Sequence, residues 1–143
     1  MSFLLDTCVL SEALSKKPNP RVLDFIDGLD PDDVYLSVIT IGELFKGIEK
    51  LPNSRRKNEL HEWFNEELLA QYDGKILPLD AGVLMTWGTL VARLEAEGYT
   101  MPAIDSLIAA TAITHELVLI TRNVGDFEKS GIEIVNPWVD AKK

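Results

Sequence analysis

Apolar runs of strand length alternate with segments of helical periodicity along the whole chain. Parallel strands need a crossover between them, usually a helix, so this alternation indicates an α/β domain with a mostly parallel sheet. About five strands are expected, at residues 3–6, 34–38, 75–78, 117–120 and 133–135. Helices are expected at residues 20–29, 40–51, 55–71, 80–97 and 102–115.

Four acidic residues lie at the ends of these predicted elements. Asp6 ends the first apolar run, and Glu43 and Asp126 come shortly after the second and the fourth. Asp105 lies beside Pro102 at the start of a helix pattern. Because ligands bind beyond the carboxyl ends of parallel strands, the four acids are expected to converge there. Carboxylate oxygens suit Mg²⁺ or Mn²⁺ better than zinc, and such a cluster can activate water for attack on a phosphodiester.

Two of these acids can also be explained as parts of helix caps. The sequence Thr-Ile-Gly-Glu that ends at Glu43 is a capping-box pattern, in which the carboxylate would only bind the Thr40 backbone N–H. Asp6 could cap the segment that begins at Thr7. Neither role needs a ligand, so the sequence leaves a structural interpretation open beside the metal site.

The other two acids, and two further ones, have similar explanations. Asp105 could serve only to favour a helix dipole, and Asp126 could serve only to stabilise the turn around it. Asp80 also follows a predicted strand, but its sequence context favours a helix N-cap. Glu12 lies about a turn and a half after Asp6, where it would either reach the cluster or be an exposed helix acid.

The size of the chain and its cysteine content narrow the class of protein. Its 143 residues fit one domain spanning 1–143. Cys8 is the only cysteine, which excludes an internal disulfide and the zinc motifs that need several cysteines. The first residues lack a basic lead-in, and no apolar run approaches the roughly 20 residues of a membrane span. These features predict a soluble, cytoplasmic protein that does not enter a membrane.

The formal net charge of −9 argues against a broad, sequence-independent contact with nucleic acid, because phosphates are bound mainly by lysine and arginine. A local basic patch follows Glu43 and consists of Lys46, Lys50, Arg55, Arg56 and Lys57. This patch is either a solvated helix face with its loop or a contact for phosphates. The overall acidity also suits a basic protein partner.

Four blocks of sequence carry a family resemblance: FLLDTCVLSE at 3–12, ITIGEL at 39–44, DSLIAATA at 105–112 and TRNVGDF at 121–127. In this order they resemble a PIN-domain ribonuclease of the VapC or FitB type, the toxins of prokaryotic toxin–antitoxin pairs. Each block alone is weakly specific, but the ordered set spans nearly the whole chain. The resemblance implies a three-layer α/β/α fold, with the sheet between two layers of helices.

The resemblance also assigns four residues to the family's acidic quartet: Asp6, Glu43, Asp105 and Asp126. The quartet holds one or two Mg²⁺ or Mn²⁺ ions. Asp6 and Asp105 are the first choices for direct ligands, and the other two acids would bind the ion, orient its water or accept a proton. The supporting polar residues are Thr7, Thr121 and Asn123. Cys8 departs from the family, which commonly has Asn in an Asp-Thr-Asn opening.

The implied function is a metal-dependent endoribonuclease that acts as the toxin of a type II toxin–antitoxin system and hydrolyses RNA phosphodiester bonds. Lys46 and Arg122 are expected to contact RNA phosphates. The expected partner is a cognate antitoxin with a DNA-binding part and a basic tail that covers the acidic site. A homodimer within a larger toxin–antitoxin assembly is also expected. No motif reads bases, so the sequence does not predict which RNA is cut.

Two other functional classes are compatible with parts of the sequence. An aspartyl-phosphate enzyme would use Asp6 as its nucleophile, but a haloacid-dehalogenase-like phosphatase needs a second acid where Cys8 stands. A receiver domain needs a phosphorylated Asp after the third strand, where Asp80 leads directly into a helix pattern. A PIN-like scaffold that binds RNA or protein without cutting it is the non-enzyme alternative, although all four acids are present.

Overall fold

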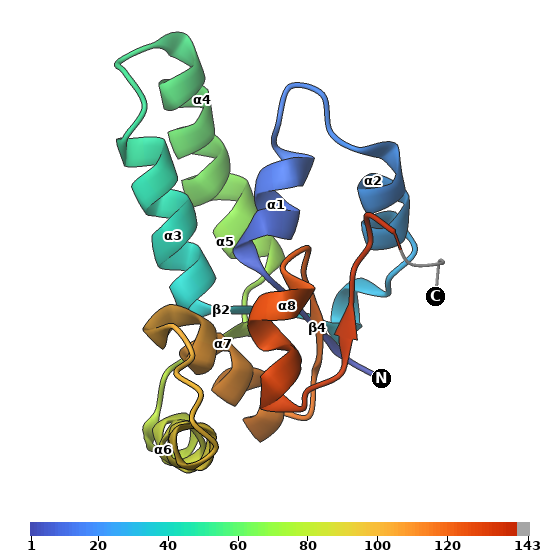
Figure 1. The fold of residues 1–143 in the computed structure, drawn as a ribbon. Coiled ribbons are helices and arrows are strands. Elements are labelled where there is room, and N and C mark those ends of the chain that lie inside the picture. Colours follow the sequence, from blue (N-terminus) through green and yellow to red (C-terminus); the bar gives the residue numbers. More distant parts are fainter. Residues whose placement is uncertain (140–143) are drawn as a thin grey trace.

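The computed structural model describes residues 1–139, so the last four residues of the expected domain lie outside the described part. Within residues 1–139 the sheet has five strands, and each of its pairings is parallel (Figure 1). The strands are β1 (Phe3–Leu5), β2 (Val34–Ser37), β3 (Ile76–Leu77), β4 (Val118–Ile120) and β5 (Ile134–Val135). Their order is β3-β2-β1-β4-β5, which puts β1 at the centre. The expected parallel sheet is confirmed, with strands one or two residues shorter than expected.

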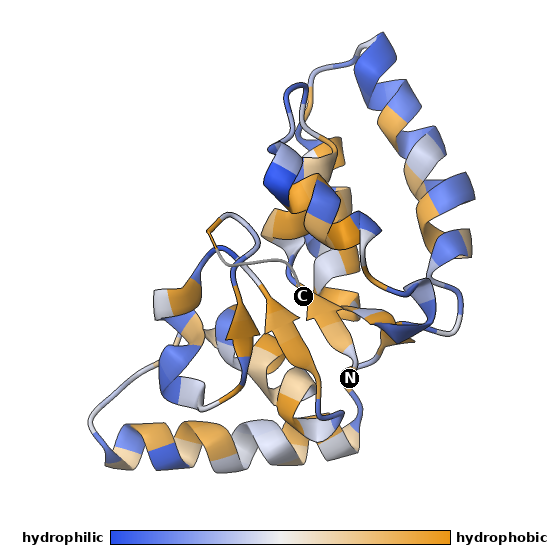
Figure 2. Cartoon of the chain, turned by 90° about the vertical axis from the view of Figure 1, so that its right-hand side faces the viewer, coloured by the Kyte–Doolittle hydropathy of each residue, from blue (hydrophilic) through white to orange (hydrophobic). Residues whose placement is uncertain are grey.

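Helices follow the strands and cover both faces of the sheet (Figures 1 and 2). They are α1 (Thr7–Ala13), α2 (Pro20–Asp27), α3 (Val38–Glu49), α4 (Arg55–Trp63), α5 (Leu69–Gln71), α6 (Ala81–Ala96), α7 (Ala103–Thr114) and α8 (Val124–Phe127). A π-helical turn, Phe64–Leu68, joins α4 to α5, so the helix expected at 55–71 contains a wider turn. Among residues 1–139, no helix combines the length and the apolar content needed to cross a membrane.

Two hydrophobic cores lie on opposite faces of the sheet. Side chains alternate along a strand, so Phe3 and Leu5 of β1 pack in one core and Leu4 packs in the other. The first core includes residues of α1, α2 and α3, and the second includes Leu90 of α6 and Ile108 of α7. Figure 2 shows the apolar strands between these helices. This is the three-layer α/β/α arrangement that the resemblance implies.

Local capping signals fix where several helices begin. Asn19 Oδ1 accepts the Arg21 N–H at 2.9 Å, and Pro20 occupies the first position of α2, where its missing N–H costs nothing. Asp80 Oδ1 accepts the Val83 N–H at 3.0 Å and caps α6. The prediction that Asp80 is an N-cap is therefore confirmed.

The capping-box explanation of Glu43 is wrong, because α3 begins earlier than the sequence pattern indicated. Ser37 ends β2 and its Oγ accepts the Ile39 N–H at 3.0 Å, so the helix begins at Val38. Thr40 therefore lies inside the first turn of α3 and cannot act as the cap. Its position leaves the Glu43 carboxylate available for another contact.

The helix α1 is absent from the helices expected above. It has seven residues and follows β1 with only Asp6 between them, so no connecting turn marks its start in the sequence. The Asp6 side chain accepts the Thr7 N–H, which confirms the alternative that Asp6 caps the segment beginning at Thr7 and shows that this segment is a helix. This cap also places Asp6 at the carboxyl end of the central strand.

Candidate active site

Asp6 is the buried acid at the centre of the carboxyl edge of the sheet, and only 6% of its surface is exposed. Its Oδ1 accepts the Thr7 N–H at 2.8 Å, and its Oδ2 accepts the Thr121 hydroxyl at 2.8 Å. Burial raises the pKa of the Asp6 carboxyl, although these hydrogen bonds oppose the rise. Asp6 is thus both a helix cap and a member of the candidate site.

Glu43 reaches the same region from α3. Its Oε1 accepts the Thr7 hydroxyl at 2.5 Å, which links residues 36 positions apart in the sequence. Thr7 Oγ1 also lies 3.1 Å from Thr40 Oγ1, and Thr40 is 1% exposed. Sequence reasoning missed the contact role of the Thr40 hydroxyl, because the capping-box pattern considers only the Thr40 backbone N–H as a partner of Glu43. Its spacing of three residues before Glu43, on one side of a helix, was the available signal.

Asp105 and Asp126 lie in the first turns of α7 and α8. Burial raises the pKa of the Asp105 carboxyl, and the negative charges of Asp126, Asp6 and Glu43 raise it further. The charges of the other three predicted acids therefore all affect the Asp105 carboxyl. Within residues 1–139, neither Asp105 nor Asp126 accepts a hydrogen bond through its carboxylate.

The four carboxylates do not form a closed metal cage. Within residues 1–139, no three His, Cys, Asp or Glu side chains come close enough together to hold one metal ion. The donor chemistry nevertheless fits Mg²⁺ or Mn²⁺, because Mg²⁺ usually keeps several waters and uses one or two carboxylates. A closed site of thiolates and imidazoles, which zinc prefers, is not what these residues offer.

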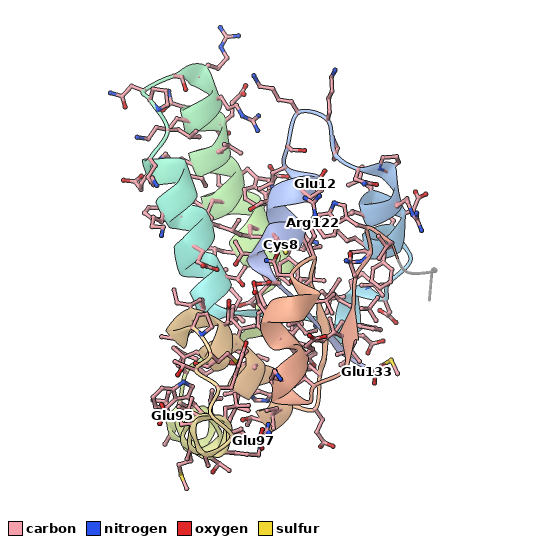
Figure 3. The ribbon with its side chains drawn as sticks, viewed as in Figure 1. Cys8, Glu12, Glu95, Glu97, Arg122 and Glu133 are labelled. Carbon is pink, nitrogen blue, oxygen red and sulfur yellow. The ribbon has the colours of Figure 1, made fainter. Side chains whose placement is uncertain are left out.

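Cys8 joins Asp6 to the loop after β4, and Figure 3 shows it beside Arg122. Its Sγ accepts the Arg122 backbone N–H at 3.5 Å and lies 3.5 Å from Thr121 Oγ1. The thiol also donates to Asp6 Oδ2 at 3.8 Å. Burial raises the pKa of the Cys8 thiol, so the neutral thiol is favoured. At the position of the family's usual Asn, Cys8 thus contacts Asp6, Thr121 and Arg122.

The predicted supporting polar residues contribute in different ways. Thr7 and Thr121 each donate a hydroxyl to an acid, as described above. Asn123 is exposed, and the contact it makes to the site is its backbone N–H, which Thr121 Oγ1 accepts at 3.1 Å. Glu12 lies partly buried on α1, and its Oε2 accepts the Asn19 N–H at 2.8 Å. Its carboxylate thus ties down the loop before α2.

Some of the predicted basic residues bond to backbone carbonyls, and others are exposed. Arg56 donates to the Leu14 carbonyl at 2.9 Å, and Lys57 donates to the Glu49 carbonyl at 3.1 Å. Lys46 is exposed one turn after Glu43 on α3. The Arg122 guanidinium lies over the Trp138 ring, with its carbon 5.2 Å from the ring centroid.

The chain matches the family of the PIN domain over residues 3–131. It belongs to the PIN-domain family. Toxin FitB of Neisseria gonorrhoeae is 41% identical over 137 residues, which cover 96% of this chain and 99% of FitB. VapC ribonuclease Y4jK of Sinorhizobium fredii is 34% identical over 138 residues, which cover 96% of this chain and 99% of Y4jK. The resemblance to VapC- and FitB-type toxins is thereby confirmed.

A solved structure agrees with this PIN-domain assignment. A chain in the structure of FitAB bound to an IR36 DNA fragment superposes with a TM-score of 0.93 and is 38% identical. The superposition covers 97% of each chain. The shared fold agrees with the family match and removes the reason for the aspartyl-phosphate alternative.

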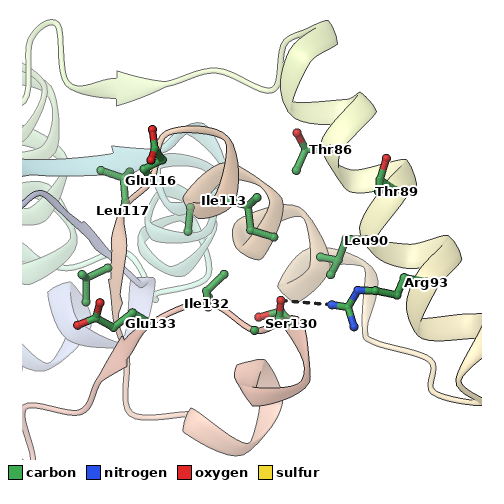
Figure 4. A pocket seen from close by; sticks show the side chains of 13 residues that line it. Thr86, Thr89, Leu90, Arg93, Ile113, Glu116, Leu117, Ser130, Ile132 and Glu133 are labelled. Atoms are coloured by element: carbon green, nitrogen blue, oxygen red, sulfur yellow. Dashed lines mark hydrogen bonds between the residues drawn. The ribbon is translucent and has the colours of Figure 1, made fainter.

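A cavity in this PIN domain lies away from the acids (Figure 4). Its volume is about 610 Å³, and it lies among α6, the end of α7 and the segment before β5. The Arg93 guanidinium reaches across it toward the Ser130 carbonyl, at 3.4 Å. None of the quartet lines this cavity, which opens near the amino ends of β4 and β5. The candidate active site lies instead at the carboxyl ends of the strands, where hydrogen bonds join Thr7 to Asp6 and Glu43 and join Thr121 to Asp6.

Proposed function

We propose that this PIN-domain protein is a metal-dependent endoribonuclease and the toxin of a type II toxin–antitoxin system. The observation that carries the proposal is the hydrogen-bond network at the sheet edge, in which Thr7 donates its backbone N–H to Asp6 and its hydroxyl to Glu43. The raised pKa of Asp105, caused first by burial and then by the charges of Asp126, Asp6 and Glu43, supports placing Asp105 and Asp126 in the same site. The name of a relative, VapC ribonuclease Y4jK, supports the ribonuclease activity. The proposal also treats residues 1–143 as one domain that works in the cytoplasm.

In this proposal Asp6 and Asp105 hold a Mg²⁺ or Mn²⁺ ion, and Glu43 and Asp126 complete the site. When bound, the ion supplies the charge that polarises a phosphate oxygen and makes a water more acidic. Thr121 and Thr7 hold two of the carboxylates in place through their hydroxyls. A fixed carboxylate needs no reorganisation when charge develops during cleavage, which lowers the barrier to the reaction.

The proposed substrate is RNA, held near the acids by Arg122 and Lys46. A relative from Shigella flexneri, 27% identical over 138 residues, is named tRNA(fMet)-specific endonuclease VapC. An RNA panel for this chain should therefore include initiator tRNA, other tRNAs and unrelated structured RNAs. The panel tests for specificity without assuming that the two proteins cut the same RNA.

The proposed partner is an antitoxin with a DNA-binding part. Its support is the solved structure of FitAB, which is bound to a DNA fragment. An acidic site within a chain of net charge −9 attracts an arginine or lysine side chain, and a guanidinium pairs well with carboxylates. We therefore propose that a basic antitoxin tail covers the quartet, and that a toxin homodimer enters the larger complex. Co-expression of the antitoxin is expected to relieve growth arrest, and bound antitoxin is expected to block access of metal to the site.

The test of the enzymatic function uses purified, antitoxin-free protein with Mg²⁺ or Mn²⁺ and with excess chelator. Wild type is expected to cleave at least one RNA of the panel, and chelation is expected to stop cleavage without unfolding the protein. Asp6→Asn is the inactive variant. Its matched control is Asp30→Asn, because Asp30 also accepts a backbone N–H, that of Asp32 at 3.0 Å, but it lies before the amino end of β2.

Three outcomes would contradict the proposal. Equal cleavage by wild type and Asp6→Asn would identify a contaminating nuclease. Cleavage that persists in excess chelator would reject the metal requirement. RNA binding without cleavage under any metal condition would favour the PIN-like scaffold, the non-enzyme alternative.

A further inference from the structure

We propose that Trp138 is a positioning residue that holds the Arg122 guanidinium at the rim of the acidic site, where it binds a phosphate of the RNA. This inference rests on the proposed function and extends it to the C-terminal segment. The PIN match ends at residue 131, so the family match gives Trp138 no role. The supporting contacts are those of residues 136–139, which follow β5.

The backbone of Arg122 is fixed next to the quartet. It follows Thr121, whose hydroxyl donates to Asp6 Oδ2 at 2.8 Å. The Arg122 N–H itself donates to Cys8 Sγ at 3.5 Å, and the same sulfur contacts Asp6 Oδ2. Two residues thus connect Arg122 to the central acid, and Figure 3 shows Arg122 beside Cys8.

The side chain of Arg122 is exposed, and within residues 1–139 it forms no ion pair with an acid. Its guanidinium carbon lies 5.2 Å from the centroid of the Trp138 ring, which is a cation–π contact. The ring attracts the cation through its electron-rich face and makes no demand on the guanidinium N–H donors. These donors remain available for a phosphate.

Trp138 is itself held in place by the chain. It is partly buried and packs against the hydrophobic core that contains α1 and α2. Its backbone N–H donates to Asn136 Oδ1 at 2.9 Å, and Pro137 beside it is buried. Arg21 of α2 donates to the Val139 carbonyl at 3.2 Å, which ties the segment down beyond the ring. A ring anchored on both sides can limit the conformations of the Arg122 side chain.

The other basic residues near the acids either use their donors within the protein or are not ordered by a contact. Arg56 and Lys57 donate to backbone carbonyls, and the exposed Lys46 ammonium forms no hydrogen bond or ion pair within the described residues. A phosphate approaching four carboxylates in a chain of net charge −9 meets repulsion. A guanidinium ordered before binding offsets this repulsion without a further loss of side-chain entropy.

The test measures binding of a labelled RNA to metal-free protein, and the salt dependence of that binding. The probe is the panel RNA that wild type cleaves or, if it cleaves none, the one that it binds most tightly. Arg122→Gln is expected to weaken binding about tenfold and to reduce the salt slope by about 0.7, because one phosphate contact is lost. Lys129→Gln removes the same charge from a second cation–π pair, 5.6 Å from the Tyr99 ring, and is expected to change binding less than about twofold.

Variants of Trp138 separate positioning from packing. Trp138→Leu keeps apolar bulk and is expected to weaken RNA binding about threefold, whereas Trp138→Phe restores most of the affinity. In the Arg122→Gln background, Trp138→Leu is expected to have no further effect on binding. In single-turnover cleavage the loss should fall on the half-saturating RNA concentration, with the maximal rate within about twofold of wild type.

The proposal is overturned if Trp138→Leu weakens binding equally with and without Arg122, or if it lowers only the maximal rate. It is also overturned if Trp138→Phe and Trp138→Leu bind RNA equally. Wild-type protein that binds RNA without cleaving it would reject the ribonuclease function, while the binding data would still decide the role of Trp138. Wild-type protein that neither binds nor cleaves any RNA would reject both.

Discussion

The two pairs of acids at the carboxyl edge are held in different ways. Asp6 and Glu43 each accept a threonine hydroxyl, and Asp6 also accepts a backbone N–H. Within residues 1–139, the carboxylates of Asp105 and Asp126 accept no hydrogen bond. The first pair is therefore ordered by the protein alone, whereas the second pair lacks a partner of this kind.

This difference implies that the two pairs contribute differently to binding a cation. Ordered carboxylates fix the position of a bound cation, because their hydrogen bonds restrict the side chains before the cation arrives. Asp105 lacks such bonds, and its pKa is raised first by burial and then by the negative charges of Asp126, Asp6 and Glu43. A divalent cation would relieve the repulsion, so the second pair should gain most from binding it.

The largest expected effects come from neutralising one acid of each pair. Asp6→Asn and Asp105→Asn are both expected to lower the single-turnover cleavage rate about a thousandfold or more, because each removes several kcal/mol of charge stabilisation. Their effects on metal-free stability should differ. Asp6→Asn keeps the cap but should destabilise the fold by about 1 kcal/mol, because an amide NH₂ group cannot accept the Thr121 hydroxyl. Asp105→Asn should be neutral or stabilising.

Melting temperatures with and without Mn²⁺ test this contrast alongside cleavage. Mn²⁺ should raise the melting temperature of wild type by mass action and should have little effect on either variant. If Asp105 only favours a helix dipole, Asp105→Asn should cost a few tenths to about 1 kcal/mol and remain active. An active but destabilised Asp105→Asn variant would thus remove Asp105 from the metal site.

The next effect concerns the hydroxyls that order the first pair. Thr7→Val and Thr121→Val keep the side-chain shape but remove a donor to Glu43 or Asp6, and each should lower cleavage about ten- to a hundredfold. The half-saturating Mn²⁺ concentration should rise in both. Thr114→Val is the matched control, because the Thr114 hydroxyl donates to the Ala110 carbonyl at the far end of α7. A loss in the control as large as in the two variants would mean that the hydroxyls act only through stability.

The sequence predicted the fold well because its apolar runs mark the strands that are buried in the sheet. A parallel strand buried on both faces is an uninterrupted apolar run, as in Phe3–Leu5 and Val118–Ile120. The predicted start of α3 is wrong because Ser37 and Thr40 are both possible N-caps in the sequence. The structure uses Ser37, whose Oγ accepts the Ile39 N–H.

The four acids could be proposed from sequence because Asp6 follows a strand, Asp105 and Asp126 lie in the first turns of helices, and Glu43 lies in the helix that follows β2. Their hydrogen bonds could not be found this way. The Thr7–Glu43 and Thr121–Asp6 bonds join residues 36 and 115 positions apart, and only the strand order brings them together. The contact between Arg122 and Trp138 depends likewise on how the segment after β5 returns to the sheet edge.

A smaller effect should appear in the pH dependence of metal-free stability. The pKa of Asp105 lies above its ordinary value of 3.8 in the folded protein, first through burial and then through Asp126, Asp6 and Glu43. Between 3.8 and that raised pKa, the folded chain binds more protons at Asp105 than the unfolded chain does. Stability from this group therefore increases as the pH falls through that window.

Urea unfolding of wild type and Asp105→Asn across this window isolates the contribution of Asp105, since the other groups are common to both proteins. The stability advantage of Asp105→Asn over wild type should shrink as the pH falls. An advantage that stays constant with pH, or a wild type that loses stability relative to the variant on acidification, would show that Asp105 is not held above its ordinary pKa.

The smallest expected effect concerns Cys8, which connects the first pair to the loop after β4. Its sulfur accepts the Arg122 N–H at 3.5 Å, and its thiol donates to Asp6 Oδ2 at 3.8 Å. An asparagine amide offers one acceptor and one donor group for the same two partners. Cys8→Asn should therefore cleave within about threefold of wild type, whereas Cys8→Ala, which removes both contacts, should lose about three- to tenfold. Single-turnover rates at saturating Mn²⁺ distinguish the two variants. If Cys8→Asn lost as much activity as Asp6→Asn, the thiol would have a role of its own that these contacts do not explain.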